Sequence, residues 1–353
     1  MKKFIYISVL IWGLIAVSES FAQDKKEAAD SSYGKIWGTA FGDYYYKTGG
    51  DSTGNQLQYT PYNKDYNAVD FRRIFLGYDY NFNSKFFASV VLGFDGSDAL
   101  TNNKRAFFIK DAYLKWKEIF TGSNLTIGLF STPGYSVATE VVWGYRSVEK
   151  TIMDQRGYLS SRDLGVMLNG SFDKDKNYGY YFMIGDGTGA SVENNKYKRF
   201  YGNLLGNFAG KKLMVDLYSD YEATGPGTSN TTFDGFIGYK TPAISAGAEY
   251  FFQYQNLNPT DKMPSGISVF LSGAVYKESV KFFARYDYFN QDTKNSSTGY
   301  NQSFVTAGID FIPYPRIHLM PNIWLNAYSK KANQTVGRYT DVVPRITFFY
   351  DYR

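Results

Sequence analysis

The chain has 353 residues, a formal net charge of +5, one histidine and no cysteine, and it contains 33 tyrosines and 29 phenylalanines. The missing cysteines exclude a disulfide framework, thiolate metal sites and cysteine nucleophiles. Because there is also only one histidine, we expect no metal site and no cofactor. The small positive charge gives no reason to expect a nucleic-acid partner. A polytopic helical membrane protein is excluded, because the one long apolar run lies at the N-terminus.

The first residues have the organisation of a signal peptide. Two lysines precede an apolar stretch over residues 4–17, and small residues suited to signal peptidase end at Ala22. We expect residues 1–22 to be a cleaved signal peptide and residues 23–32 to be a short periplasmic segment. An uncleaved anchor helix is the alternative, which the shortness of the apolar stretch disfavours.

Apolar and polar residues alternate through most of the remaining chain. In residues 280–288 the apolar side chains share one parity, while Lys281 and Arg285 share the other. Residues 244–254 and 342–352 alternate in the same way. Period two is typical of strands with one apolar and one polar face. Segments of about 9 to 13 residues with aromatic ends favour tilted membrane strands, and a secreted aromatic-rich sandwich or propeller is the alternative.

Short and long connections alternate between these segments. Seven tight turns and eight longer loops predict 16 strands in residues 33–353, an all-β, transmembrane, antiparallel up-and-down barrel. Counts of 14 or 18 strands remain alternatives. We expect the short turns and both termini in the periplasm of a bacterial cell, with the barrel in the outer membrane. Lys110 breaks the alternation of its segment, which places it near the membrane edge or beside a bulge. The expected longer loops are 47–67, 95–104, 131–162, 186–196, 222–231, 255–266, 290–301 and 329–340.

One of these loops, residues 131–162, is long and rich in charge. Its apolar residues argue against disorder, and Gly157 is placed to end a short helix over residues 146–156. We expect this loop to fold into the barrel and to form a pore constriction, and an outer loop covering the mouth is the alternative. The predicted constriction residues are Glu140, Arg146, Glu149, Lys150, Asp154 and Arg156.

Three segments resemble the phosphate-selective porin (O and P) family. They are FRRIFLGYDY at 71–80, DAYLKW at 111–116 and SSRDLGV at 160–166, in the order and spacing of that family. The resemblance implies a sixteen-stranded homotrimeric barrel surrounded by outer-membrane lipid and lipopolysaccharide, in which the third outer loop narrows the pore. It also implies passive diffusion of small hydrophilic solutes or ions.

The charges that alternation directs inward differ from the basic ladder of anion-selective members. Basic and acidic side chains are both abundant at these positions, which predicts a field across the pore, so the phosphate specificity of the family is not carried over to this chain. The basic positions are Arg73, Lys115, Arg199, Lys281, Arg285, Arg316 and Arg345. The acidic positions are Asp79, Asp95, Asp111, Asp216, Glu249, Asp287 and Asp310. As pore-wall residues we single out Arg73, Lys115, Arg162 and Arg285.

Two other functions remain as alternatives to a channel. A barrel enzyme acting on membrane lipid needs a base, for which His318 is the one histidine, together with a nearby serine and an orienting polar group. Nothing in the sequence pairs His318 with Ser272 or Ser303, so we predict that the protein is not an enzyme. An adhesion barrel needs large folded outer loops, whereas the loops other than 131–162 are short and polar.

Overall fold

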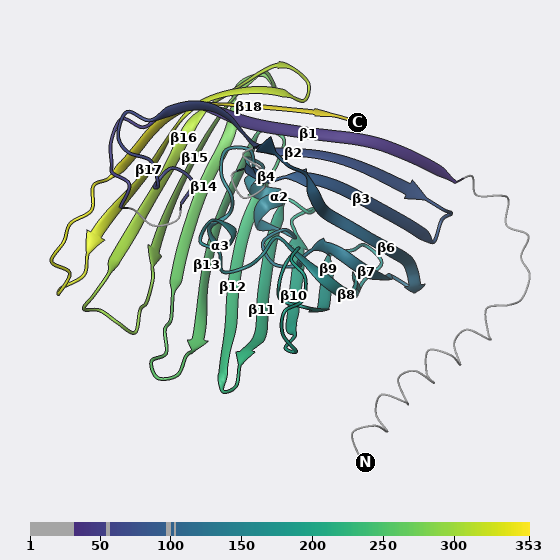
Figure 1. Ribbon diagram of the computed structural model, residues 1–353. Coiled ribbons are helices and arrows are strands. Elements are labelled where there is room, and N and C mark those ends of the chain that lie inside the picture. The colour runs from purple at the N-terminus through teal and green to yellow at the C-terminus, as the bar shows by residue number, and fades with distance from the viewer. Residues whose placement is uncertain (1–31, 54–56, 97–99, 102–103) are drawn as a thin grey trace, which may run out of the picture.

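Sixteen strands close into one antiparallel barrel, in which β1 pairs with both β2 and β18 (Figure 1). This computed structural model describes residues 32–353 except 54–56, 97–99 and 102–103. The predicted signal peptide and most of the predicted periplasmic segment therefore lie outside the described residues. The predicted fold class and strand number are confirmed. The barrel strands are β1 (Tyr33–Tyr46), β2 (Asn67–Asn81), β3 (Phe86–Phe94), β6 (Phe108–Phe120), β7 (Ser123–Ser131), β8 (Arg162–Ser171), β9 (Tyr178–Gly185), β10 (Arg199–Phe208), β11 (Leu213–Gly225), β12 (Thr228–Lys240), β13 (Ile244–Asn256), β14 (Ser265–Tyr276), β15 (Val280–Asn290), β16 (Tyr300–Tyr314), β17 (Ile317–Lys330) and β18 (Asp341–Tyr352).

The connections between strands follow the predicted alternation with one exception. A long loop over residues 222–231 is absent, because β11 runs to Gly225 and β12 begins at Thr228. The polar sequence here still forms a strand ladder, with Tyr221 paired to Thr231, and Gly227 takes the left-handed φ of +73° in the tight turn. In the loop after β3, β4 (Leu100–Thr101) and β5 (Lys104–Arg105) form a separate small hairpin.

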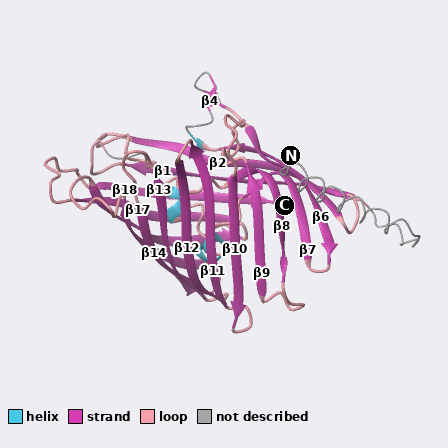
Figure 2. Cartoon of the chain, turned by 90° about the horizontal axis from the view of Figure 1, so that it is seen from below, coloured by secondary structure: helices cyan, strands magenta, loops and turns pink. Residues whose placement is uncertain are grey.

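The exposed and buried faces of the strands follow the predicted parity. In β15, Tyr286 is 42% exposed, whereas its neighbours Arg285 and Asp287 are 3% and 0% exposed. The apolar parity thus lies on the outer surface and the polar parity lies inside the barrel, as a membrane barrel requires. Figure 2 shows that strands make up most of the described chain. Within the described residues, no helix is long and apolar enough to cross a membrane.

Two β-bulges turn extra charged side chains inward. In the β1–β2 pairing, Phe41 faces Arg73 and Gly42 faces Phe71, so Arg72 is the additional residue. In the β3–β6 pairing the register shifts in the same way around Lys110, which confirms the predicted bulge there. Because each bulge adds one residue to one strand, Arg72 is buried beside Arg73, and Lys110 is buried beside Asp111.

The segment between β7 and β8 carries two short helices, α2 (Thr139–Trp143) and α3 (Ile152–Gln155). The predicted helix over 146–156 is therefore wrong except for its last turns, and α2 was not predicted. Gly144 ends α2 with a φ of +70°. Between the helices the backbone is held by partners on the barrel wall, which override the local helical preference. Arg72 on β2 and Arg345 on β18, for example, donate hydrogen bonds to the Val148 carbonyl.

Candidate functional site

Segment 131–162 is packed against the inner parity of the wall. The ring of Trp143, at the end of α2, lies 5.2 Å from Phe270 on β14 and makes an edge contact with Phe283 on β15. Val142 and Trp143 are at most 1% exposed. Near α3, Ile152 and Met153 join a second buried apolar cluster with Phe251 and other wall residues. Burial of this apolar surface fixes the segment to β12–β15.

Glu149 is the most completely enclosed charge of this segment. Its Oε2 accepts a hydrogen bond of 2.8 Å from the Trp324 indole on β17, and its backbone oxygen accepts one of 3.0 Å from Trp143. Burial by itself favours the neutral acid, but the positive charges of Arg345 and Arg72 outweigh it and hold the pKa of Glu149 below its ordinary value. Both arginines also donate to the Val148 carbonyl.

Four of the six predicted constriction residues form one ion-pair cluster. Arg146 lies 3.2 Å from Glu140 and 2.8 Å from Asp154, and Lys150 lies 3.7 Å from the other oxygen of Asp154. Burial raises the pKa of Asp154, but Arg146 and Lys150 lower it by more, so that it lies below its ordinary value. The side chains of Arg146, Glu140 and Lys150 are about a quarter to a third exposed, at 25%, 29% and 35%.

Arg156 lies away from this cluster. Its guanidinium donates to Gln302 at 2.6 Å and to Asn326 at 3.3 Å, on β16 and β17, and covers the Phe289 ring at 4.9 Å. Arg156 therefore attaches the end of α3 to β16 and β17, while Glu149 attaches the middle of the segment to β17. Arg156 is thus separated from the ion-pair cluster, whereas Glu149 forms no ion pair with it but lines the same cavity as Arg146 and Lys150.

Two of the four predicted wall residues lie in a charged patch on β2, β3, β6 and β8. The Asp95 carboxylate forms ion pairs with Arg73 at 3.1 Å and with Lys110 at 3.0 Å. Asp111 forms a bidentate ion pair with Arg162. The bulge residues Arg72 and Lys110 were not among the predicted site residues. Strict alternation points them outward, and a doubled basic residue such as Arg72–Arg73 inside an apolar strand is the signal that indicates a bulge.

The other two wall residues have different surroundings. Lys115 lies beside Tyr113 with its ammonium 6.0 Å from the ring centre. The Arg285 side chain is 1% exposed, because it is paired with Asp287 at 2.5 Å and donates to the Lys150 carbonyl. Arg316, which alternation placed on the wall, instead occupies the β16–β17 turn with a φ of +74° and a side chain 54% exposed.

Sequence reasoning also missed the role of loop 47–67. Tyr59 in this loop is 1% exposed, and its hydroxyl donates to Asp43 at 2.7 Å and accepts from Arg345 at 2.9 Å. At the base of the loop, Lys47 pairs with Asp341 at 2.6 Å, and both side chains are almost fully buried. The tyrosines of an otherwise polar loop are the sequence signal for this packing.

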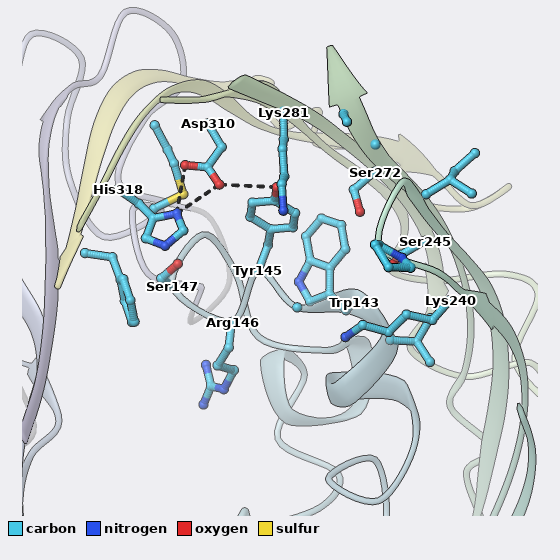
Figure 3. A pocket seen from close by; sticks show the side chains of 18 of the residues that line it. Trp143, Tyr145, Arg146, Ser147, Lys240, Ser245, Ser272, Lys281, Asp310 and His318 are labelled. Atoms are coloured by element: carbon cyan, nitrogen blue, oxygen red, sulfur yellow. Dashed lines mark hydrogen bonds and ion pairs between the residues drawn. The ribbon is translucent and has the colours of Figure 1, made fainter. Parts of the chain in front are cut away.

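Two cavities share part of their lining. One, of about 450 Å³, lies toward the long loops and includes Tyr59, Arg73 and Asp95 in its lining. The other, of about 480 Å³, lies toward the short turns and includes Lys240 and His318 (Figure 3). Arg146 and Phe41 line both cavities. Below, these are called the loop-side cavity and the turn-side cavity.

His318 has one of the groups that a catalytic base requires. Its Nδ1 lies 2.9 Å from Asp310, whose other oxygen accepts a hydrogen bond of 3.3 Å from Tyr145 (Figure 3). Ser147 and Ser272 line the same cavity, but no serine hydroxyl of the described chain lies within hydrogen-bond distance of the imidazole. The orienting carboxylate is present, and a nucleophile in contact with the base is not.

The described part of the chain does not contain a cluster of three acidic or histidine side chains suited to a metal ion.

Comparison with known proteins identifies the fold and no closer relationship. No protein-family description matches the sequence, and no curated protein matches it. Among solved structures, the outer membrane channel DcaP of Acinetobacter baumannii is 11% identical, with a TM-score of 0.68 over 94% of this chain and 100% of that chain. The anion-selective porin from Comamonas acidovorans is 13% identical, with a TM-score of 0.63 over 91% and 100%. The trimer form of OmpT, an outer membrane protein of Vibrio cholerae, is 12% identical, with a TM-score of 0.61 over 92% and 100%. The chain therefore has the fold of the outer-membrane porins.

Proposed function

We propose that the protein is an outer-membrane porin through which small hydrophilic solutes or ions diffuse passively. The observation that carries this proposal is the shared lining of the two cavities. One lies among the long loops and the other among the short turns, and Arg146 and Phe41 line both. The path between the two ends of the barrel then passes the cluster of Arg146, Glu140, Asp154 and Lys150.

Segment 131–162 is the constriction in this proposal. Its apolar side chains attach it to β12–β15, so that the loop-side cavity is left beside β1 and β2. Both sides of that path carry charges of both signs, because Asp95 pairs with Arg73 on the wall and Asp154 pairs with Arg146 on the segment. Such a field orients dipolar solutes, and the narrow cross-section excludes large ones.

The cellular setting belongs to the same proposal. We infer that residues 1–22 are a cleaved signal peptide, that residues 23–32 lie in the periplasm, and that the barrel of residues 33–353 sits in outer-membrane lipid and lipopolysaccharide. The exposed apolar parity supports a lipid environment. The trimer described for OmpT supports a homotrimer.

Single-channel recording of the folded protein in a planar lipid bilayer tests the proposal. We expect stepwise conductance in potassium chloride, and no steps from the same protein added after heat denaturation. If correctly folded barrels, verified by their altered gel mobility without boiling, give no steps, the proposal is wrong.

A barrel hydrolase acting on membrane lipid is the second candidate, because Asp310 orients His318. This function requires Ser147 or Ser272 to approach the imidazole. Ester hydrolysis by the purified barrel in detergent micelles, compared with His318→Ala, separates the two functions. We expect no hydrolysis by either protein, and hydrolysis that is lost in the variant would favour the enzyme.

A further inference from the structure

The turn-side cavity contains two lysines that form no ion pair among the described residues, although Lys281 faces Asp310 across the β15–β16 ladder. Lys240 is the last residue of β12 and Lys281 is the second residue of β15. Among the described residues neither lysine has a carboxylate within 4 Å, and Lys240 donates only to the Val141 carbonyl of α2. The one carboxylate of the cavity, Asp310, already binds His318 and Tyr145.

Hydroxyl groups lie between these two lysines. Across the ladder, Lys240 faces Ser245 on β13, and Ser245 faces Ser272 on β14. Ser272 in turn faces Phe283, two residues from Lys281 on β15. Adjacent strands are about 4.8 Å apart, so this row spans four neighbouring strands on the inner face of the wall. The row consists of hydrogen-bond donors, and no described residue is hydrogen bonded to either serine side chain.

Aromatic rings form part of the remaining lining of the cavity. Trp143 and Tyr145 lie between Lys240 and Lys281 in the view of Figure 3. Rings from β1, β2 and β18 also line the cavity, which encloses about 480 Å³, a volume in the range of small-molecule sites. The cavity therefore combines a flat apolar wall with a cationic, donor-rich edge.

We propose that the turn-side cavity is a binding site for small anions with a flat aromatic body, that is, for aromatic carboxylates. The carboxylate accepts hydrogen bonds from the row formed by Lys240, Ser245, Ser272 and Lys281, since charge-assisted hydrogen bonds are the strong ones. The ring of the ligand packs against Phe75 and Phe349, which line the cavity and are partly exposed. This inference rests on the proposed function, because it names a class of solute that binds inside the channel on its way through.

Benzoate tests the proposal as a blocker of single-channel current in potassium chloride at constant ionic strength. Acetate supplies the carboxylate without the ring, and benzamide supplies the ring without the charge. We expect benzoate to reach half-block at a concentration about tenfold or more below that of either comparison compound. Equal block by benzoate and acetate would overturn the proposal, because it would indicate a general anion effect.

Paired variants locate the site. The double variant Lys240→Gln/Lys281→Gln removes both cavity charges, and Lys211→Gln/Lys277→Gln removes two exposed charges from other short turns at the same end. We expect the first pair to raise the half-blocking concentration of benzoate by about tenfold and the second pair to change it by less than about twofold. Equal shifts in the two pairs would overturn the proposal.

Direct binding separates this inference from the channel proposal. Saturation-transfer NMR of benzoate with the folded barrel in detergent detects binding without any current. Conductance steps without benzoate binding would overturn this inference and leave the porin intact. Binding that disappears in Lys240→Gln/Lys281→Gln would support the site even if the barrel does not conduct.

Discussion

Trp324 on β17 donates its indole hydrogen to Glu149 at 2.8 Å, and thereby joins the middle of segment 131–162 to the barrel wall. The acceptor is only 3% exposed, and the nearby Arg345 and Arg72 donate to the neighbouring Val148 carbonyl. The segment is thus held by a charged centre in addition to the apolar contacts of α2. This centre makes the position of the proposed constriction sensitive to single substitutions.

Removal of the buried carboxylate is expected to loosen the segment. Glu149→Ala leaves buried guanidinium groups without their counter-charge and costs about 3–5 kcal/mol of unfolding free energy. Unfolding by guanidinium chloride from lipid vesicles measures the loss. The control is Glu140→Ala, whose partly exposed side chain is expected to contribute about 0–1 kcal/mol. Equal losses in the two variants would show that Glu149 does not hold the segment.

The same carboxylate predicts a dependence on pH. Because the pKa of Glu149 is lower in the folded protein than its ordinary value, its charge stabilises the fold above the ordinary value of about 4.3. This contribution is lost as the pH falls through the folded-state pKa, and Asp154 behaves in the same direction. Stability of the wild type should therefore decline more steeply below about pH 4 than that of Glu149→Gln. Parallel curves for the two proteins would contradict this assignment.

Ion preference is expected to follow the charges at the junction of the two cavities. Arg146→Ala removes a positive charge from the path, so the reversal potential in a potassium chloride gradient should shift toward potassium. Asp154→Asn should shift it toward chloride. Unchanged reversal potentials in both variants would place the ion path elsewhere.

Arg285 is expected to behave differently, although it was also predicted as a pore residue. Its side chain is enclosed by Asp287 and by the Lys150 carbonyl. Arg285→Ala leaves Asp287 buried without its partner, which costs about 3–5 kcal/mol. We expect a loss of unfolding free energy with less change in reversal potential than in Arg146→Ala, and the reverse pattern would place Arg285 on the ion path.

The barrel could be predicted from the sequence because successive side chains of a strand point alternately to lipid and to the barrel interior. Apolar and polar residues therefore alternate with the same period of two. Val280 to Asn290 shows this directly, since flipping its register would turn Lys281 and Arg285 toward lipid. The site was less predictable, because it depends on departures from that period. Bulges turn Arg72 and Lys110 inward. Side-chain contacts with other parts of the barrel, which no local sequence pattern encodes, bury Arg285 and separate Arg156 from the other loop charges.

Tyr59 provides a test of the second loop that the sequence did not predict to pack inside. Its hydroxyl links Asp43 on β1 to Arg345 on β18, across the closing seam of the barrel. Tyr59→Phe keeps the ring but leaves both partners with one hydrogen bond fewer, which costs about 1–3 kcal/mol. Tyr66→Phe is the matched control, because Tyr66 is 45% exposed, and it should change the unfolding free energy by less than about 0.5 kcal/mol. Unfolding in guanidinium chloride distinguishes them, and equal stability of both variants and the wild type would show that loop 47–67 does not brace the seam.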